Sequence, residues 1–304
     1  MKLTKLYVGA FALSAMLVAC DSDSASAKDT EIEELSSSSV VEIASSSSTT
    51  RNDGLSSSAM ETSSSSETTQ SSSSSENISA GSVYDATAKT LTDLRDGQTY
   101  KTVTIGDQTW MAENLNYAYT GVPYEYIKES EVYASDSMSW CYDNDPANCA
   151  KYGRLYTWAA AMDSVGTWTT NGKGCGYNKT CSPTYPVRGV CPEGWHLPDT
   201  TEWNSLFKAV GGRSTAGQVL KSQTGWEDCG NGTDAFGFSA LPAGGRFYGG
   251  GYDAEGYIAN FWRSTEYDSD RAYSMYLDSY YDSDYASLGN YYKDYGRSVR
   301  CLKD

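Results

Sequence analysis

The stretch from Gly189 to Gly212 constrains the fold more than any other part of the chain, because it combines a turn, a helix start and a helix end. It reads GVCPEGWHLPDTTEWNSLFKAVGG. Asp199 is a suitable N-cap, and Glu202 can reach back to the Asp199 N–H as in a capping box. Four apolar side chains then follow the spacing of one helical face, namely Trp203, Leu206, Phe207 and Val210. Since Gly211 can take the left-handed conformation that ends a helix, the stretch predicts a helix with one buried face.

Hydrophobic periodicity predicts further elements on both sides of this helix. Alternating apolar residues between Gly97 and Leu115 predict a β-hairpin around the Gly106-Asp107 turn. Helical spacing of Leu155, Trp158, Ala159 and Met162 predicts a first amphipathic helix, and a short third helix is expected over Ser214–Ser222. The remaining glycine-rich and aromatic segments predict short strands joined by turns: Phe236–Leu241, Arg246–Tyr248, Ile258–Ser264, Ala272–Leu277, Asp284–Leu288 and Ser298–Leu302.

Residues 1–19 have the pattern of a secretory signal peptide. Lys2 and Lys5 precede an apolar run that is too short to require a membrane span. The following Leu17-Val18-Ala19-Cys20 resembles a bacterial lipobox, which implies cleavage before Cys20 and a lipid on its thiol. An ordinary signal peptide with an incidental cysteine is the alternative. A lipid on Cys20 would make the membrane a partner and predicts a place in the cell envelope, at the outer membrane or cell surface, although the residues leave the choice of membrane open.

Residues 20–80 are predicted to form a disordered, lipid-anchored linker. The segment contains five serine runs, at 36–39, 45–48, 56–58, 63–66 and 71–75. Such a composition cannot bury enough apolar surface to offset the conformational entropy of folding. A flexible chain of this length spans roughly 45 Å, and its 11 acidic and 2 basic residues repel one another and extend it further. The segment therefore predicts a tether that holds a folded domain away from the membrane.

Residues 81–304 have the composition of one globular domain, which is aromatic, glycine-rich and cysteine-containing. Its 28 acidic and 19 basic residues give a net charge of −9. That balance argues against nucleic acid and anionic lipid surfaces as partners. No motif in the domain indicates a cofactor.

Seven cysteines follow Cys20, and in an exported protein they predict a disulfide framework. The close pairs are expected to close small surface loops, and the remaining pair would join the central turn to the chain end: Cys141 with Cys149, Cys175 with Cys181, and Cys191 with Cys301. Cys229 is then left over, either free or exchanged with one of these partners. A zinc site is the competing interpretation, but there is no C-x₂-C pair and the domain has one histidine.

Several blocks of sequence resemble the Fibrobacter succinogenes major paralogous domain (FISUMP) of bacterial surface lipoproteins. They are TYKTVTIGDQTWMAENLNY, GRLYTWAAAM, CPEGWHLPDTTEW, GTDAFGFSALPAGGR, ANFWRSTE and SVRCLKD, and they span 97–304. The LP-x-x-x-EW portion is distantly similar to the formylglycine-generating-enzyme group. The resemblance implies an α+β, C-type-lectin-like fold, with two main helices on short antiparallel strands. Arg263 departs from the serine common in the family, which changes the local surface.

No catalytic residue is predicted. Formylglycine-generating enzymes use a cysteine pair near the C-terminus, where this chain has only Cys301. His196 stands without a nucleophile elbow or an H-E-x-x-H motif, so a structural role in the GWHLP turn, beside Trp195, is expected. Asp199 and Glu202 are explained by capping. The sequence therefore favours a non-enzymatic binding or adhesion protein, and the alternative is an exported enzyme or accessory domain that acts on polysaccharide.

The segment from Tyr248 to Tyr295 is rich in tyrosine and aspartate. Exposed tyrosine rings can stack on sugar rings or contact a surface protein, while the alternative is cross-strand pairing on a partly exposed sheet. Adjacent tyrosines on a strand point to opposite faces, so the best ligand-binding candidates are Tyr280, Tyr281, Tyr291 and Tyr292. The D-x-D pieces at 268–270 and 282–284 lack the rest of a calcium loop, so no metal is expected.

Overall fold

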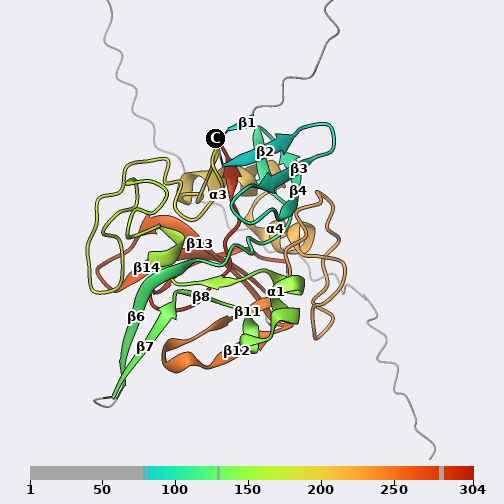
Figure 1. The fold of residues 1–304 in the computed structure, drawn as a ribbon. Coiled ribbons are helices and arrows are strands. Elements are labelled where there is room, and N and C mark those ends of the chain that lie inside the picture. Colours follow the sequence, from blue (N-terminus) through green and yellow to red (C-terminus); the bar gives the residue numbers. More distant parts are fainter. Residues whose placement is uncertain (1–77, 80, 129–130, 281–283) are drawn as a thin grey trace, which may run out of the picture. The chain divides into compact units, whose positions relative to one another are not determined.

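The computed structural model describes residues 78–79, 81–128, 131–280 and 284–304. The predicted signal peptide, Cys20 and the serine runs lie outside the described residues. The described part is mixed in class, with mostly strands and few helices (Figure 1). None of its helices has the length and apolar character needed to cross a bilayer.

The elements of the described part follow one another in a strand-rich order. The strands are β1 Ile78–Ser79, β2 Ser82–Asp85, β3 Thr90–Asp93, β4 Thr99–Ile105, β5 Gln108–Met111, β6 Thr120–Lys128, β7 Glu131–Ser137, β8 Ser139–Trp140, β9 Leu155–Tyr156, β10 Trp195–His196, β11 Ala243–Arg246, β12 Tyr252–Glu255, β13 Ile258–Glu266, β14 Arg271–Asp278, β15 Ser287–Tyr292 and β16 Leu302–Lys303. The helices are η1 Tyr142–Asn144, α1 Pro146–Tyr152, α2 Trp158–Ala161, α3 Thr200–Ala209, α4 Arg213–Leu220 and η2 Tyr248–Gly250.

The largest sheet joins the start of the described part to its end. Its order is β1-β2-β3-β4-β5-β16-β10, with antiparallel neighbours. The hairpin predicted between Gly97 and Leu115 is confirmed as β4 and β5, which pair Ile105 with Gln108 across a turn where Gly106 has φ 59°. Leu302 of β16 lies between Trp110 of this hairpin and β10.

The predicted central helix is confirmed as α3. The Asp199 carboxylate accepts hydrogen bonds from the Thr201 and Glu202 N–H groups at 2.7 and 2.9 Å, and Glu202 Oε2 accepts from the Asp199 N–H at 2.8 Å. Gly211 has φ 97° after the last turn. The predicted third helix is also found, as α4, with bounds one to two residues earlier than expected.

The predicted amphipathic helix over Gly153–Met162 is wrong in its extent. Only α2 is helical there, and Leu155 belongs to β9. The reason is a long-range pairing that local periodicity does not signal: the Tyr156 N–H and C=O bond with the backbone of Arg297 at 2.7 and 2.9 Å. Helix α1, which was not predicted, begins in the loop after Cys141 and continues past Cys149, with Asp145 as N-cap and a proline at its start.

The predicted strands of the C-terminal region are correct at β13 and β14 and wrong elsewhere. Strand β15 begins at Ser287 rather than Asp284, Tyr248 starts the short helix η2, and β16 covers only the end of Ser298–Leu302. The segment Phe236–Leu241 is not a strand. Its chain turns instead, because the Asp234 carboxylate accepts the Ser239 N–H at 2.7 Å and both residues have positive φ.

Three disulfides are found in the described part, with the pairing expected from the sequence. They join Cys141 to Cys149, Cys175 to Cys181 and Cys191 to Cys301. No cysteine of the described part is free, and this includes Cys229. The prediction that Cys229 is left over is therefore wrong, because elimination among the seven cysteines after residue 20 does not fix its state.

Two hydrophobic cores lie on opposite faces of the sheet β13-β14-β15. Trp262 and Ala272 belong to the first core, with Trp158, Trp195 and Leu197. Residues of the other face belong to the second core, which α3 and α4 cover: Ala259, Phe261, Met275 and Leu277 pack with Trp110, Trp203, Phe207 and Leu220. Because side chains alternate along a strand, this sheet contributes to both cores at once.

Candidate functional site

His196 has a structural environment, as expected, but its partners are side chains rather than the turn itself. The ring is 5% exposed, with Nδ1 2.6 Å from Asp304 Oδ1 and Nε2 2.8 Å from Glu202 Oε1. Burial alone lowers the pKa of His196, but the hydrogen bonds to Asp304 and Glu202 outweigh it and raise the pKa from 6.5 to about 9. Both nitrogens are thus engaged with carboxylates, at the point where Figure 1 marks the C-terminus beside α3.

The aspartates of the first D-x-D piece also have local partners. Asp268 accepts hydrogen bonds from the N–H groups of Asp270 and Arg271 at 3.0 and 2.7 Å, and from the Arg271 guanidinium at 3.0 and 2.7 Å. Arg271 lowers the pKa of Asp268. In the ranges that the structure describes, no group of three or more histidine, cysteine or acidic side chains is placed to hold a metal. The second piece, at 282–284, lies partly outside them.

Among the three candidate tyrosines that the structure describes, Tyr280 lies apart from Tyr291 and Tyr292. Tyr292 is 46% exposed and Tyr291 is half-buried, which agrees with their alternation on β15. Tyr280 is 50% exposed but follows the end of β14, so strand alternation does not apply to it, and its ring stacks on Tyr257 at 4.8 Å. Tyr281 lies outside the described residues. Tyr292 pairs with Arg271, the first residue of β14, whereas Tyr280 follows the last residue of that strand. The two ends of β14 are roughly 24 Å apart.

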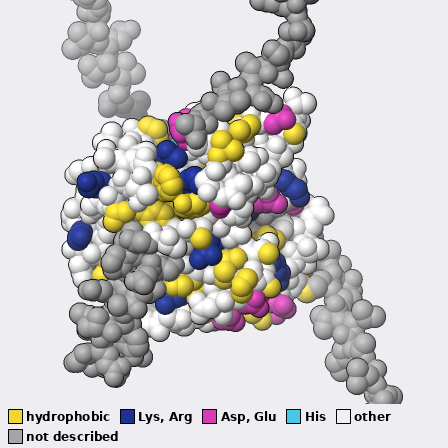
Figure 2. Space-filling view, viewed as in Figure 1, with side chains coloured by type: hydrophobic (Ala, Val, Ile, Leu, Met, Phe, Trp, Pro, Cys, Tyr) yellow, Lys and Arg dark blue, Asp and Glu magenta, His cyan; other side chains and the backbone are white. Residues whose placement is uncertain are grey.

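Tyr295 and the three aromatic residues around it form a continuous group, which we call the tyrosine surface: Phe247, Tyr248, Tyr292 and Tyr295. The Tyr295 ring centroid is 5.1 Å from that of Phe247, 6.2 Å from Tyr248 and 5.7 Å from Tyr292. Tyr248 is 53% exposed. On the face shown in Figure 2, hydrophobic side chains, tyrosine included, gather over the β11–β12 region that flanks Tyr248.

Sequence reasoning missed three members of this surface. Phe247 and Tyr248 precede β12, whereas Tyr295 follows β15, so nothing local links them. They meet because the Arg246 and Gly296 backbones exchange hydrogen bonds at 3.0 and 2.7 Å. The sequence indicated only that the segment from Tyr248 to Tyr295 has a high tyrosine content.

Arg297 lies against the inner side of the tyrosine surface. Its residue is 2% exposed, and its Cζ lies 3.9 Å from the ring centroid of Tyr291, 5.7 Å from that of Tyr295 and 5.8 Å from that of Trp262. Burial lowers the pKa of Arg297 to about 10, although Tyr291 and Tyr295 raise it. The guanidinium therefore remains charged at neutral pH, beside rings whose faces attract a cation.

Asp294 adds a buried acid next to Tyr295. Burial raises the pKa of Asp294 from 3.8 to about 6, while nearby Arg246 lowers it and Asp270 raises it. At pH 7 the carboxyl is mainly ionised. Asp294 thus places a negative charge next to Tyr295 in the chain, and the charged groups that act on it are Arg246 and Asp270.

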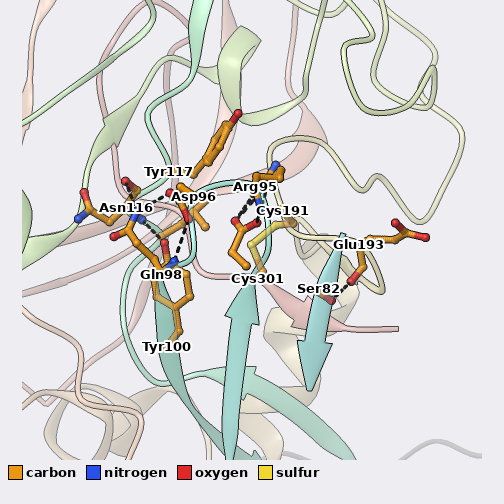
Figure 3. Close-up of polar contacts among 12 residues, drawn as sticks. Ser82, Arg95, Asp96, Gln98, Tyr100, Asn116, Tyr117, Cys191, Glu193 and Cys301 are labelled. Carbon is orange, nitrogen blue, oxygen red and sulfur yellow. Dashed lines mark hydrogen bonds and ion pairs between the residues drawn. A yellow bond between two sulfur atoms is a disulfide. The ribbon is translucent and has the colours of Figure 1, made fainter. Parts of the chain in front are cut away.

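A second cluster of polar contacts, drawn in Figure 3, lies at the N-terminal strands β2 and β3. Arg95 makes a bidentate pair with the fully buried Asp93, with contacts of 2.9 and 2.7 Å, and its Cζ lies 4.0 Å from the Tyr117 ring centroid. Ser82 donates to the Glu193 carbonyl at 2.6 Å. These contacts fasten β2 and β3 to the rest of the domain, and the Asp93 carboxylate neutralises Arg95. We therefore assign this group to the fold.

Comparison with known proteins gives one match. The family model of the Fibrobacter succinogenes major domain matches residues 103–303. No curated protein and no solved structure matches the chain. The matched range begins within β4 and ends within β16, so it includes the second core, most of the first core, the three disulfides and the tyrosine surface.

Proposed function

The chain belongs to the Fibrobacter succinogenes major domain family, and from that premise we propose that it is a lipid-anchored cell-surface protein that binds glycans and catalyses no reaction. In this proposal residues 1–19 are the signal peptide, Cys20 carries the lipid, 20–80 are the tether, and 81–304 are a binding domain of C-type-lectin-like type. The tyrosine surface is its ligand-binding site.

The observation that carries the proposal is the grouping of exposed tyrosine rings in the tyrosine surface. Tyr248 and Tyr292 are each about half exposed, and the Tyr295 ring lies 6.2 Å from the first and 5.7 Å from the second. A tyrosine ring offers a flat apolar face with a hydroxyl at its edge and loses little conformational entropy on binding. Such faces match the C–H faces of sugar rings.

Two contacts support the absence of catalysis. The ring nitrogens of His196 are both engaged with carboxylates, so the single histidine of the domain is not placed to act as a general base. The thiol of Cys301 is bonded to Cys191, which leaves no C-terminal cysteine nucleophile there. Both arrangements fit structural roles.

The proposal predicts that single tyrosine rings contribute to glycan binding. We expect Tyr248→Ala and Tyr292→Ala in the full-length protein to weaken binding to insoluble polysaccharides about threefold to tenfold, since one aromatic contact contributes about 0.5–1.5 kcal/mol. Depletion assays on a panel of plant-wall and cell-surface glycans measure this. Thermal melting of both variants should stay near that of the wild type, because the rings are exposed.

Tyr280→Ala is the matched control, because Tyr280 is equally exposed but lies near the other end of β14. It should leave binding unchanged. Tyr291→Ala should lower both binding and stability, the latter by about 2–3 kcal/mol, because its half-buried ring covers Arg297. A wild-type protein that binds no glycan of the panel, or one whose binding depends on Tyr280 alone, contradicts the proposed site.

Anchoring is tested separately through Cys20. If its thiol carries a lipid, Cys20→Ser should release the protein from the membrane fraction or block signal processing, whereas a substitution at the neighbouring Ser22 should not. Cell fractionation and the mass of the mature protein measure the two effects. A Cys20→Ser variant that is processed normally and stays with the membrane contradicts the lipid anchor.

A further inference from the structure

The buried lysine and arginine side chains of the described part differ in whether they donate hydrogen bonds. Five lysine or arginine residues are buried there: Lys221, Arg263, Lys293, Arg297 and Arg300. Four of them donate hydrogen bonds: Lys221 to the Asp278 carbonyl, Arg263 to Thr200 Oγ1, Lys293 to Glu266 Oε1 and Arg300 to Asn114 Oδ1. Each of these four charges therefore has a polar group of the fold beside it.

Arg297 is the exception among these five. Its side chain has no hydrogen bond and no ion pair within the described part of the chain, and its Nε is buried without a partner. Its neighbours are the rings of Tyr291, Tyr295 and Trp262. Removing a guanidinium from water without replacing its hydrogen bonds costs several kcal/mol, so a buried charge of this kind is normally paired.

The Arg297 guanidinium lies close to a tyrosine ring and to the backbone of β11. The Tyr291 ring covers one face of the guanidinium, and the backbone of Gly245 in β11 lies near its end. A Cβ placed on Gly245 would lie 3.5 Å from Arg297 Nη1, in ordinary van der Waals contact, so a side chain at this position would lie directly beside the donor. Tyr295 contacts both Arg297 and the exposed Tyr292, which links the charge to the tyrosine surface.

We propose that Arg297 binds the carboxylate of an acidic sugar whose ring lies on the tyrosine surface. This inference rests on the proposed function and names its ligand class, a glycan that contains uronic acid. A guanidinium matches a carboxylate with two parallel hydrogen bonds, and such a pair is stronger away from water. A neutral sugar would leave the charge of Arg297 uncompensated.

The net negative charge of the domain also limits how many carboxylates the glycan can have. The domain has a net charge of −9, so a polymer with a carboxylate on every sugar is repelled at long range. A glycan with single uronate residues among neutral sugars pairs with Arg297 and avoids most of this repulsion. The flat tyrosine faces favour a sugar over an acidic peptide as the carrier of the carboxylate.

The experiment compares acidic oligosaccharides with their carboxyl-reduced forms, in which each carboxylate has become a hydroxymethyl group. Glucuronoxylan, alginate and polygalacturonate oligosaccharides are titrated against the full-length protein at 50 and 500 mM NaCl. We expect the glucuronoxylan oligosaccharide, with its sparse uronate, to bind at least tenfold more tightly than its reduced form. Arg297→Met should abolish this difference and change the affinity for the reduced form less than threefold.

Two further variants control for folding and for overall charge. Gly245→Ala keeps Arg297 and meets only ordinary contacts of 3.4 and 3.5 Å, so it should fold and yet weaken binding of the acidic form by occupying the space beside Nη1. Arg271→Met removes a surface arginine that pairs with Asp268, and it should leave the acidic preference intact. If Arg297→Met does not fold, Gly245→Ala still decides the question.

The possible failures of the inference and of the proposed function are distinguishable. If neutral glycans bind through Tyr292 while acidic and reduced forms bind equally, the inference is wrong and the proposed function stands. If no glycan binds, both are wrong. Binding of a glutamate-rich peptide that is lost in Arg297→Met, without preference for acidic sugars, would show a carboxylate site for a protein partner and would overturn the glycan assignment.

Discussion

His196 is the only histidine of the chain, which makes its proton directly observable. Its pKa is about 9 in the folded protein and 6.5 when unperturbed. A raised pKa means that the folded state binds the proton more tightly than the unfolded state does. The resulting stabilisation is fully present below pH 6.5 and is lost as the pH rises to about 9, with a total on the order of 3 kcal/mol.

We therefore predict that the His196 ring signal in an NMR titration stays in its protonated position at pH 7.5 and moves only near pH 9. Stability of the wild type relative to His196→Gln, measured by urea unfolding, should fall over the same range. Asp304→Asn, which removes one partner, should lower the pKa. A folded-state midpoint near 6.5 would contradict the two-carboxylate environment.

At the scale of elements, α3 depends on its first turn. Asp199→Ala removes the acceptor for two backbone N–H groups and should lower the free energy of unfolding by about 1–2 kcal/mol. Ser205→Ala on the exposed side of the same helix is the control and should change it by less than about 0.5 kcal/mol. Denaturant unfolding measures both, and equal effects would mean that the capping box does not stabilise α3.

Local signals predicted the elements whose hydrogen bonds are local. The α3 capping box and the β4–β5 turn are completed within a few residues, so the sequence alone located them. Strand β9 could not be located in this way, because the Tyr156 backbone pairs with Arg297, 141 positions later. The same kind of long-range pairing, between Arg246 and Gly296, assembles the tyrosine surface. The sequence therefore predicted that one ring of the pair Tyr291 and Tyr292 is exposed, but it did not predict that Tyr292 lies beside Tyr295.

At the scale of the whole molecule, the Cys191–Cys301 bond closes a span of 110 residues. In the chain-entropy description, replacing both cysteines by alanine should cost about 4–5 kcal/mol, and the same change at Cys141 and Cys149, eight residues apart, about 2–3 kcal/mol. Guanidinium unfolding of the two double variants measures the difference. Equal losses would show that loop length does not decide the contribution of these bonds.

The Cys191–Cys301 bond also determines what proteolysis can do to the domain. The strands β11 to β15 and every ring of the tyrosine surface lie between these two cysteines in the chain. A protease that cuts one exposed loop in this span produces two fragments, but the bond still joins them, and the packed sheet still holds the new ends. A nicked domain can thus keep its rings in place until a reductant separates the fragments.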